Sequence, residues 1–175
     1  MMDLSPASRD AMSLPAPTRL VVGSLAIALL FNLLPWSGWA LHIHTDFLLL
    51  MLLYWVAHES GIMGQGWGFF LGLLMDVANS ALLGQHALTY VVAVFFVQLL
   101  RVRILQLTVV EQALHIGAVL LLAQSIGVLL NLSLGHDFPG WGLLLAPILG
   151  ALLWPVVNWL AKQPRFRRRF GQVLR

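Results

Sequence analysis

The chain has 175 residues, of which 59% are hydrophobic and 10% are charged, and its formal net charge at pH 7 is +3. Soluble domains carry about 25% charged residues, so this chain has too few polar side chains to cover a water-exposed surface. The composition excludes an ordinary soluble domain, and the absence of cysteine excludes disulfides, cysteine-ligated metals and thiol catalysis.

Residues 1–17 contain three prolines and no apolar periodicity, which predicts a flexible cytoplasmic N-terminal segment. The first apolar segment, residues 20–36, approaches the about 20 residues that a helix needs to cross the hydrocarbon layer. A cleavable signal peptide is the alternative, because small residues follow at positions typical of a cleavage site. Trp36 and Trp39 favour the membrane helix, since tryptophan gathers at membrane interfaces.

Five further apolar segments follow, each bounded by turn-forming or charged residues: 47–57, 66–78, 86–100, 109–134 and 141–161. We therefore expect an all-α, polytopic membrane protein of about six transmembrane helices. Residues 18–161 would form a single transmembrane helical domain, followed by a basic cytoplasmic tail of residues 162–175. Because the segment at 47–57 is short for a full crossing, segments two and three are either two spans or a shallow hairpin.

The positions of the basic residues indicate whether the chain crosses the membrane an even or an odd number of times, because Lys and Arg in short loops stay on the cytoplasmic side. With six crossings and an inner amino terminus, all ten basic residues fall inside, and the three outer connections near 37–45, 79–85 and 135–140 contain none. The sequence thus predicts a multi-pass membrane protein with both termini in the cytoplasm. The basic tail either contacts anionic membrane lipid or only anchors the last helix, and we infer no nucleic-acid binding from it.

Glycine recurs every four residues in and before the third segment. Gly64, Gly68 and Gly72 lead to Asp76, so these four residues form one slanted ridge of a helix. Small residues let another backbone approach closely, and such close packing drives helix association in lipid. The ridge is a predicted contact face, either for a helix of this chain or for a partner protein.

Asp76 is predicted at a membrane depth where an isolated charge costs about 2.5–3.5 kcal/mol to insert, so it should be paired, hydrated or protonated. One interpretation is a functional carboxylate. The other is structural: Asp76 caps or hydrogen-bonds the following turn, residues 77–84, where Asn79 and Ser80 favour turn geometry. The sequence alone leaves both open.

The sixth segment repeats the pattern of small residues. Gly142, Ala146 and Gly150 precede Trp154 and Pro155, which predicts a second close contact followed by a kink. Scattered polar residues on the other segments are interpreted as interhelical hydrogen-bonding groups, because a proton relay would show more carboxylates: Gln98, Gln112, His115, Gln124, Ser125 and Asn131.

A metal site has little support in the sequence. His42, His44 and Asp46 alternate in a way that would place three ligand types on one side of an extended loop. The outer loops otherwise contribute only His136 and Asp137. We therefore predict no metal and no cofactor.

Catalysis is also weakly supported. His58 and Glu59 begin like a zinc-protease motif, but the second histidine is missing. An intramembrane enzyme that uses Asp76 with His86 or His115 is the least favoured class of function, because no acid–base geometry can be derived from the sequence. We expect a protein that is not an enzyme.

Several motifs, taken in order, resemble one membrane family. Tyr54 and Trp55 end a leucine-rich segment, the glycine-rich segment ends with Gly72 and Asp76, Leu83 and Gly84 precede the next helix, and Trp154 and Pro155 lie in the last. This order, which covers most of the membrane region, resembles the rod shape-determining protein MreD family. The proline-rich N-terminal segment departs from the family pattern, as does His58, where many relatives have proline.

The resemblance implies a component of the bacterial cell-elongation (rod) complex, needed for cell shape and lateral peptidoglycan synthesis. It implies binding to MreC and, directly or through MreC, to MreB and to the elongation glycosyltransferase and transpeptidase. The family's fold resembles the substrate-binding (S) component of energy-coupling-factor transporters, so a small-solute, vitamin-like binding or transport component is the alternative. Residues expected to pack helices or to contact a partner are Gly64, Gly68, Gly72, Asp76, Gly84, Gly142, Ala146 and Gly150.

Overall fold

The computed structural model describes residues 16–35, 45–59, 61–135, 137–138 and 140–173, which form six α-helices and one short 3-10 helix and contain no strand. Several residues considered above lie outside this part of the chain. They are residues 1–15, and also Trp36, Trp39, His42, His44 and His136. The side chains of the basic tail, residues 162–175, lie outside it as well.

The helices are α2 (Thr18–Asn32), α4 (Phe47–His58), α5 (Gln65–Ala78), α6 (Gln85–Gln106), α7 (Val109–Ser133) and α8 (Leu145–Val173), and η1 (Trp141–Leu144) leads into α8. Each α-helix corresponds to one predicted apolar segment. α6 continues beyond its segment to Gln106, and the α8 backbone stays helical through most of the basic tail. The all-α prediction is therefore confirmed for the described residues.

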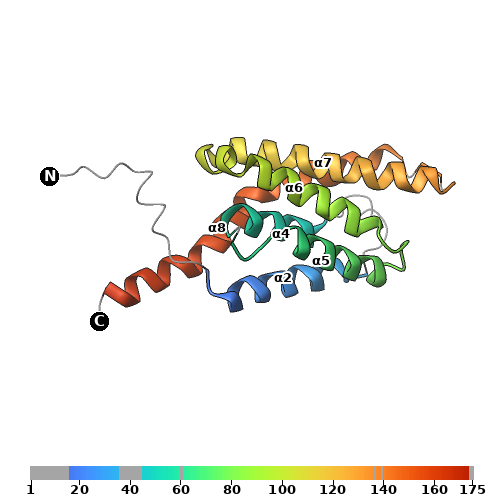
Figure 1. Cartoon of the computed structure of the whole chain (residues 1–175). Coiled ribbons are helices and arrows are strands. Elements are labelled where there is room, and N and C mark those ends of the chain that lie inside the picture. Colours follow the sequence, from blue (N-terminus) through green and yellow to red (C-terminus); the bar gives the residue numbers. More distant parts are fainter. Residues whose placement is uncertain (1–15, 36–44, 60, 136, 139, 174–175) are drawn as a thin grey trace.

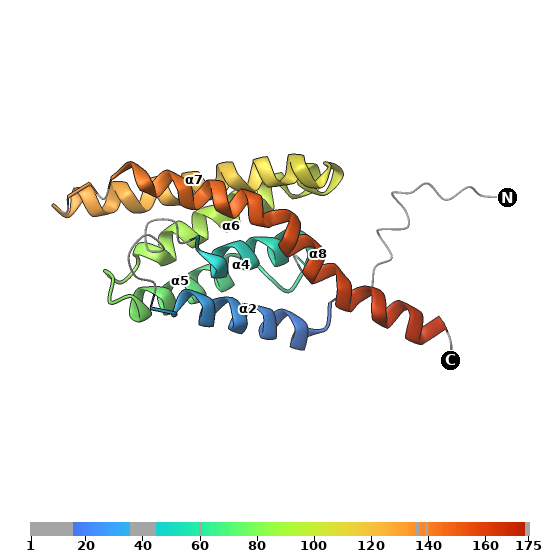
Figure 2. The same ribbon diagram turned by 180° about the vertical axis from the view of Figure 1, so that it is seen from behind.

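The helices lie roughly alongside one another in a bundle, with α7 on one side, α2 on the opposite side and α4 between them (Figures 1 and 2). α4 contacts α2, α6 and α8, and nine of its twelve residues are buried. A helix of twelve residues is about 18 Å long, shorter than the about 30 Å hydrocarbon layer. Because protein surrounds α4, its ends do not leave backbone groups facing lipid.

Within the described residues, three helices are long and apolar enough to cross a membrane: α6, α7 and the Gly142–Ala161 part of η1 and α8. α2 and α4 are shorter apolar helices, and α5 has 14 residues. Large apolar side chains stay exposed on the outer faces of the helices, including Ile27, Leu30, Val102, Leu114, Leu129 and Leu152. A surface of this kind is expected of a protein covered by lipid.

The core is built around the aromatic residues of α4 and α8. Tyr54, Trp55 and Trp154 are fully buried. The ring centroid of Tyr54 lies 5.2 Å from that of Trp55 and 6.0 Å from that of Trp154. The indole N–H of Trp55 donates to Oγ of Ser24 at 2.8 Å, which joins α4 to α2. These residues therefore hold three helices together.

α8 runs along α7 at first and then turns diagonally past the end of the bundle (Figure 2). Pro155 lies within this helix, where its ring removes one backbone hydrogen bond. At that same end of the bundle, Nε of Arg101 donates to the Ala57 carbonyl oxygen at 2.8 Å. A cation there satisfies a terminal carbonyl and complements the negative end of the α4 dipole.

Candidate functional site

The glycine ridge of α5 packs against α6 of the same chain. A Cβ added at Gly72 would lie 2.4 Å from Cα of Ala87, a distance that real Cβ atoms do not reach. A Cβ at Gly68 would lie 3.1 Å from Cγ2 of Val94, and one at Gly64 would lie 3.4 Å from the side-chain nitrogen of Gln98. The ridge thus allows two antiparallel helices to approach at backbone contact.

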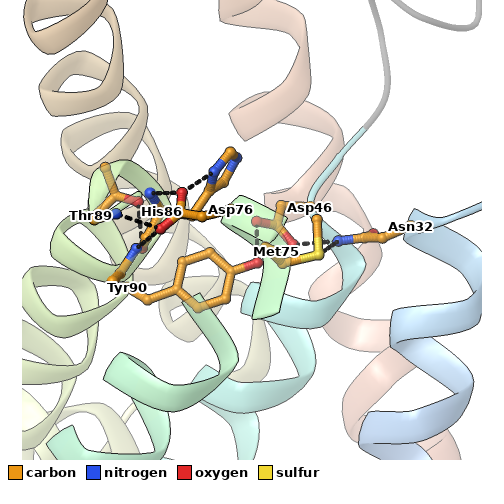
Figure 3. A network of polar contacts seen from close by, with 9 residues as sticks. Asn32, Asp46, Met75, Asp76, His86, Thr89 and Tyr90 are labelled. Atoms are coloured by element: carbon orange, nitrogen blue, oxygen red, sulfur yellow. Dashed lines mark hydrogen bonds and ion pairs between the residues drawn. The ribbon is translucent and has the colours of Figure 1, made fainter. Parts of the chain in front are cut away.

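The carboxylate at the end of this ridge organises the start of α6. Asp76 is fully buried, and its oxygens accept from the backbone N–H groups of Gly84 at 2.8 Å, His86 at 2.7 Å and Ala87 at 3.4 Å. Nδ1 of His86 lies 2.9 Å from Oδ1 of the same carboxylate. Figure 3 shows these contacts gathered around the Asp76 carboxylate.

Gly84 explains why this carboxylate is needed. It is the N-cap residue of α6 and adopts the left-handed conformation, with φ +101°, which glycine accommodates without strain. Because Gly84 has no side chain, it cannot cap the helix itself. Asp76 supplies the acceptor from α5 and places negative charge at the positive end of the α6 dipole. This geometry agrees with the interpretation in which Asp76 hydrogen-bonds the turn that follows it.

The two histidines considered with Asp76 lie in different surroundings. His86 pairs with Asp76 and keeps 27% of its side-chain surface exposed. His115 lies on α7, where its Nδ1 is 2.8 Å from the Glu111 carbonyl oxygen of its own helix. The structure therefore brings together Asp76 and His86.

A second polar network lies close to the first and was not predicted (Figure 3). Asp46 caps α4 by accepting from the Leu49 N–H at 2.9 Å. It also accepts from the Asn32 amide at 2.7 Å and from the Tyr90 hydroxyl at 2.5 Å. Oδ1 of Asn32 in turn accepts from the Phe47 N–H at 3.0 Å. The network ties the ends of α2, α4 and α6 together.

A cavity of about 610 Å³ opens beside these networks. It lies between the ends of α2 and α5, the second half of α7, η1, and the first turns of α4, α6 and α8. Its polar lining comes from Asn32, Thr45, Asp46, Asn79, Gln85, His86, Thr89, Tyr90, Gln124 and Asn131, and its apolar lining includes Leu49, Met75, Leu120 and Leu143. This volume is in the range of small-molecule sites, about 300–1,000 Å³.

Ala146 and Gly150 of the sixth segment contact other parts of the bundle. A Cβ at Gly150 would lie 2.5 Å from Cδ1 of Leu120 on α7. The carbonyl oxygen of Ala146 accepts from Oγ1 of Thr45 at 2.9 Å, and Gly142 lies in η1. Gly117 makes a further close contact that was not predicted: a Cβ there would lie 2.9 Å from Cβ of Ala151.

One predicted hydrogen-bonding residue, Gln112, joins α7 to α8. Its Oε1 accepts from Nε1 of Trp154 and Nδ2 of Asn158, both at 3.3 Å, and its amide donates to the Leu107 carbonyl oxygen at 3.1 Å. Gln112 is buried, so its amide is an interhelical contact and not a free polar group.

Neither polar network has the composition of a metal site. Among the described residues, no three or more His, Cys, Asp or Glu side chains gather so that they could hold a metal ion. Asp46 instead uses its oxygens for Leu49, Asn32 and Tyr90. His42 and His44, the other two members of the predicted alternation, are outside the described part of the chain.

Comparison with known proteins gives one family. Residues 17–163 match the family described as rod shape-determining protein MreD. The matched region contains α2, α4, α5, α6, α7 and η1 in full, and α8 up to residue 163. No solved structure matches this chain.

Proposed function

This chain belongs to the rod shape-determining protein MreD family, whose members are rod-shape determining membrane proteins, and we propose that it is a non-enzymatic component of the cell-elongation complex. In this proposal it lies in the inner membrane with both termini in the cytoplasm and acts by binding MreC. MreB and the elongation glycosyltransferase and transpeptidase join it directly or through MreC. The match over residues 17–163 carries the proposal.

The packing of the bundle narrows where MreC would bind. The ridge of Gly64, Gly68 and Gly72 is covered by α6, so its role is to join α5 to α6. The substitution Gly72→Leu would disrupt the contact between α5 and α6 inside the chain. A loss of MreC binding in that variant would therefore not show that the ridge itself binds MreC. We therefore place the MreC surface on the outward faces of the helices, where large apolar side chains are exposed.

The experiment that tests this function is depletion of the protein from a rod-shaped bacterium, combined with recovery of MreC on the tagged full-length chain. We expect depleted cells to become round and MreC to co-purify in mild detergent. Depleted cells that keep their rod shape, or a well-expressed chain that recovers no MreC, would contradict the proposal.

Supplying vitamins to depleted cells distinguishes a scaffold from the alternative function, a small-solute transport component. Rounding caused by loss of a scaffold persists when vitamins are supplied, whereas a growth defect caused by loss of a transporter is rescued. The likeness of the family's fold to the substrate-binding component of energy-coupling-factor transporters remains a proposal for this chain, and an experimental structure of the full protein would test it.

A further inference from the structure

The cavity contains amide groups that the fold does not use. Gln124 and Asn131 lie seven residues apart on α7, on a face turned toward α6, and both line the cavity. Among the described residues, neither side-chain amide has a hydrogen-bonding partner. On a helix of membrane-spanning length, an unpaired amide is costly unless it meets water or another polar molecule.

Other lining groups point to the same chemistry. Gln85 reaches the cavity from the start of α6, and Asn79 from the end of α5. Nδ1 of His86 is held by Asp76, so Nε2 is the ring nitrogen left for the cavity. Each primary amide offers both donors and an acceptor, and Nε2 of His86 adds a further polar atom. These groups match hydroxyl or amide groups of a bound molecule.

The charges of the lining side chains indicate whether a bound molecule would be charged. Among the described residues, no Lys or Arg lines the cavity, so no permanent positive charge there balances an anion. The one carboxylate among the described lining residues, Asp46, already accepts from the Asn32 amide, the Leu49 N–H and the Tyr90 hydroxyl, so its oxygens are used within the fold. The apolar side chains of Leu49, Met75 and Leu120 would contact the carbon skeleton of a ligand.

We propose that this cavity is a binding site for an uncharged small molecule rich in hydroxyl or amide groups, held by Gln124, Asn131, Gln85 and His86. The site opens at the end of the bundle whose connections lack Lys and Arg, which the positive-inside rule puts on the outer face of the membrane. The proposal does not depend on MreC binding, because it concerns the interior of the bundle.

The first test compares amides that the fold uses with amides that it does not. In the purified full-length protein, the double change Gln124→Leu and Asn131→Leu should leave the thermal unfolding midpoint unchanged or raise it, because no internal hydrogen bond is lost. Gln112→Leu is the matched control on the same helix and should lower the midpoint, since it leaves Trp154 and Asn158 without their acceptor. An equal loss in both variants would show that Gln124 and Asn131 are structural and would overturn the proposal.

The second test measures binding with probes of matched shape and different charge. N-acetylglucosamine carries hydroxyl and amide groups without charge, and N-acetylglucosamine 6-phosphate is its anionic counterpart. We expect the neutral sugar at millimolar concentration to raise the unfolding midpoint by about 2–4 °C, and the double variant to lose this shift. No shift with the neutral sugar, an equal shift with both sugars, or a shift that survives in the double variant would overturn the proposal.

Discussion

At the scale of single residues, Asp76 shows how a buried carboxylate becomes part of a fold. Its two oxygens serve three backbone N–H groups and one histidine, all at the start of the next helix. Such charge-assisted hydrogen bonds are stronger than neutral ones, and they offset the cost of burying the charge. Asp76 therefore fixes the turn that reverses the chain between α5 and α6.

We predict that Asp76→Ala lowers the free energy of unfolding by about 2–4 kcal/mol, because the N–H groups of Gly84 and His86 lose their acceptor. Asp76→Asn keeps one carbonyl acceptor and should cost less. Thermal unfolding of the two purified variants measures the difference. If Asp76→Ala accumulates and unfolds like the wild type yet fails to restore rod shape, the carboxylate has a functional role and the structural account is wrong.

Part of this site is predictable from the amino-acid sequence. The sequence predicts that Asp76 interacts with the turn after it, because a carboxylate at the end of an apolar segment needs hydrogen-bonding or charged partners. The bonds from Asp46 to Asn32 and Tyr90 are not predictable, since they join residues 14 and 44 positions apart and no local pattern encodes such a pairing. The N-cap position of Asp46, directly before an apolar run, was the one available signal.

At the scale of helices, the spacing of the glycines predicted a contact face but not its occupant. Four-residue spacing defines the ridge whether the neighbour is α6 or another protein. The structure assigns it to α6 through Gly68 and Gly72. Asp76 hydrogen-bonds the turn at Gly84, and Gly72 contacts Ala87. Both interactions hold α5 against α6, so they stabilise the same helix pair.

We predict opposite effects for the same substitution at two glycines of α5. Gly72→Ala forces its new methyl group against Ala87 and should cost at least about 1–3 kcal/mol of stability. Gly66→Ala is the matched control. Its Cβ would have no atom within 4 Å beyond the neighbouring residues and the backbone of its own helix, and alanine raises helix propensity, so stability should stay the same or rise by up to about 1 kcal/mol. Denaturation in detergent compares the two, and a Gly72→Ala protein as stable as wild type would contradict the close α5–α6 contact.

At the scale of the whole molecule, apolar segments indicated where every described α-helix lies, but not which helices lipid would cover. α4 is apolar throughout, and a segment of this kind has the same pattern in lipid as in a protein core. Its burial follows from contacts with α2, α6 and α8, which lie far apart in sequence. The helical continuation of α8 through the tail was not predicted either, because charged and apolar residues mix there.

We propose that the bundle spans the membrane with Arg101 and Arg103 on the inner side and the cavity on the outer side. The chain has no cysteine, so single substitutions can be labelled without background. We predict that a membrane-impermeant maleimide labels Leu82→Cys, between α5 and α6, in intact spheroplasts. Gln106→Cys, at the other end of α6, should react only after permeabilisation. Labelling of Gln106→Cys in intact spheroplasts with protection of Leu82→Cys would contradict the topology and the outer placement of the cavity.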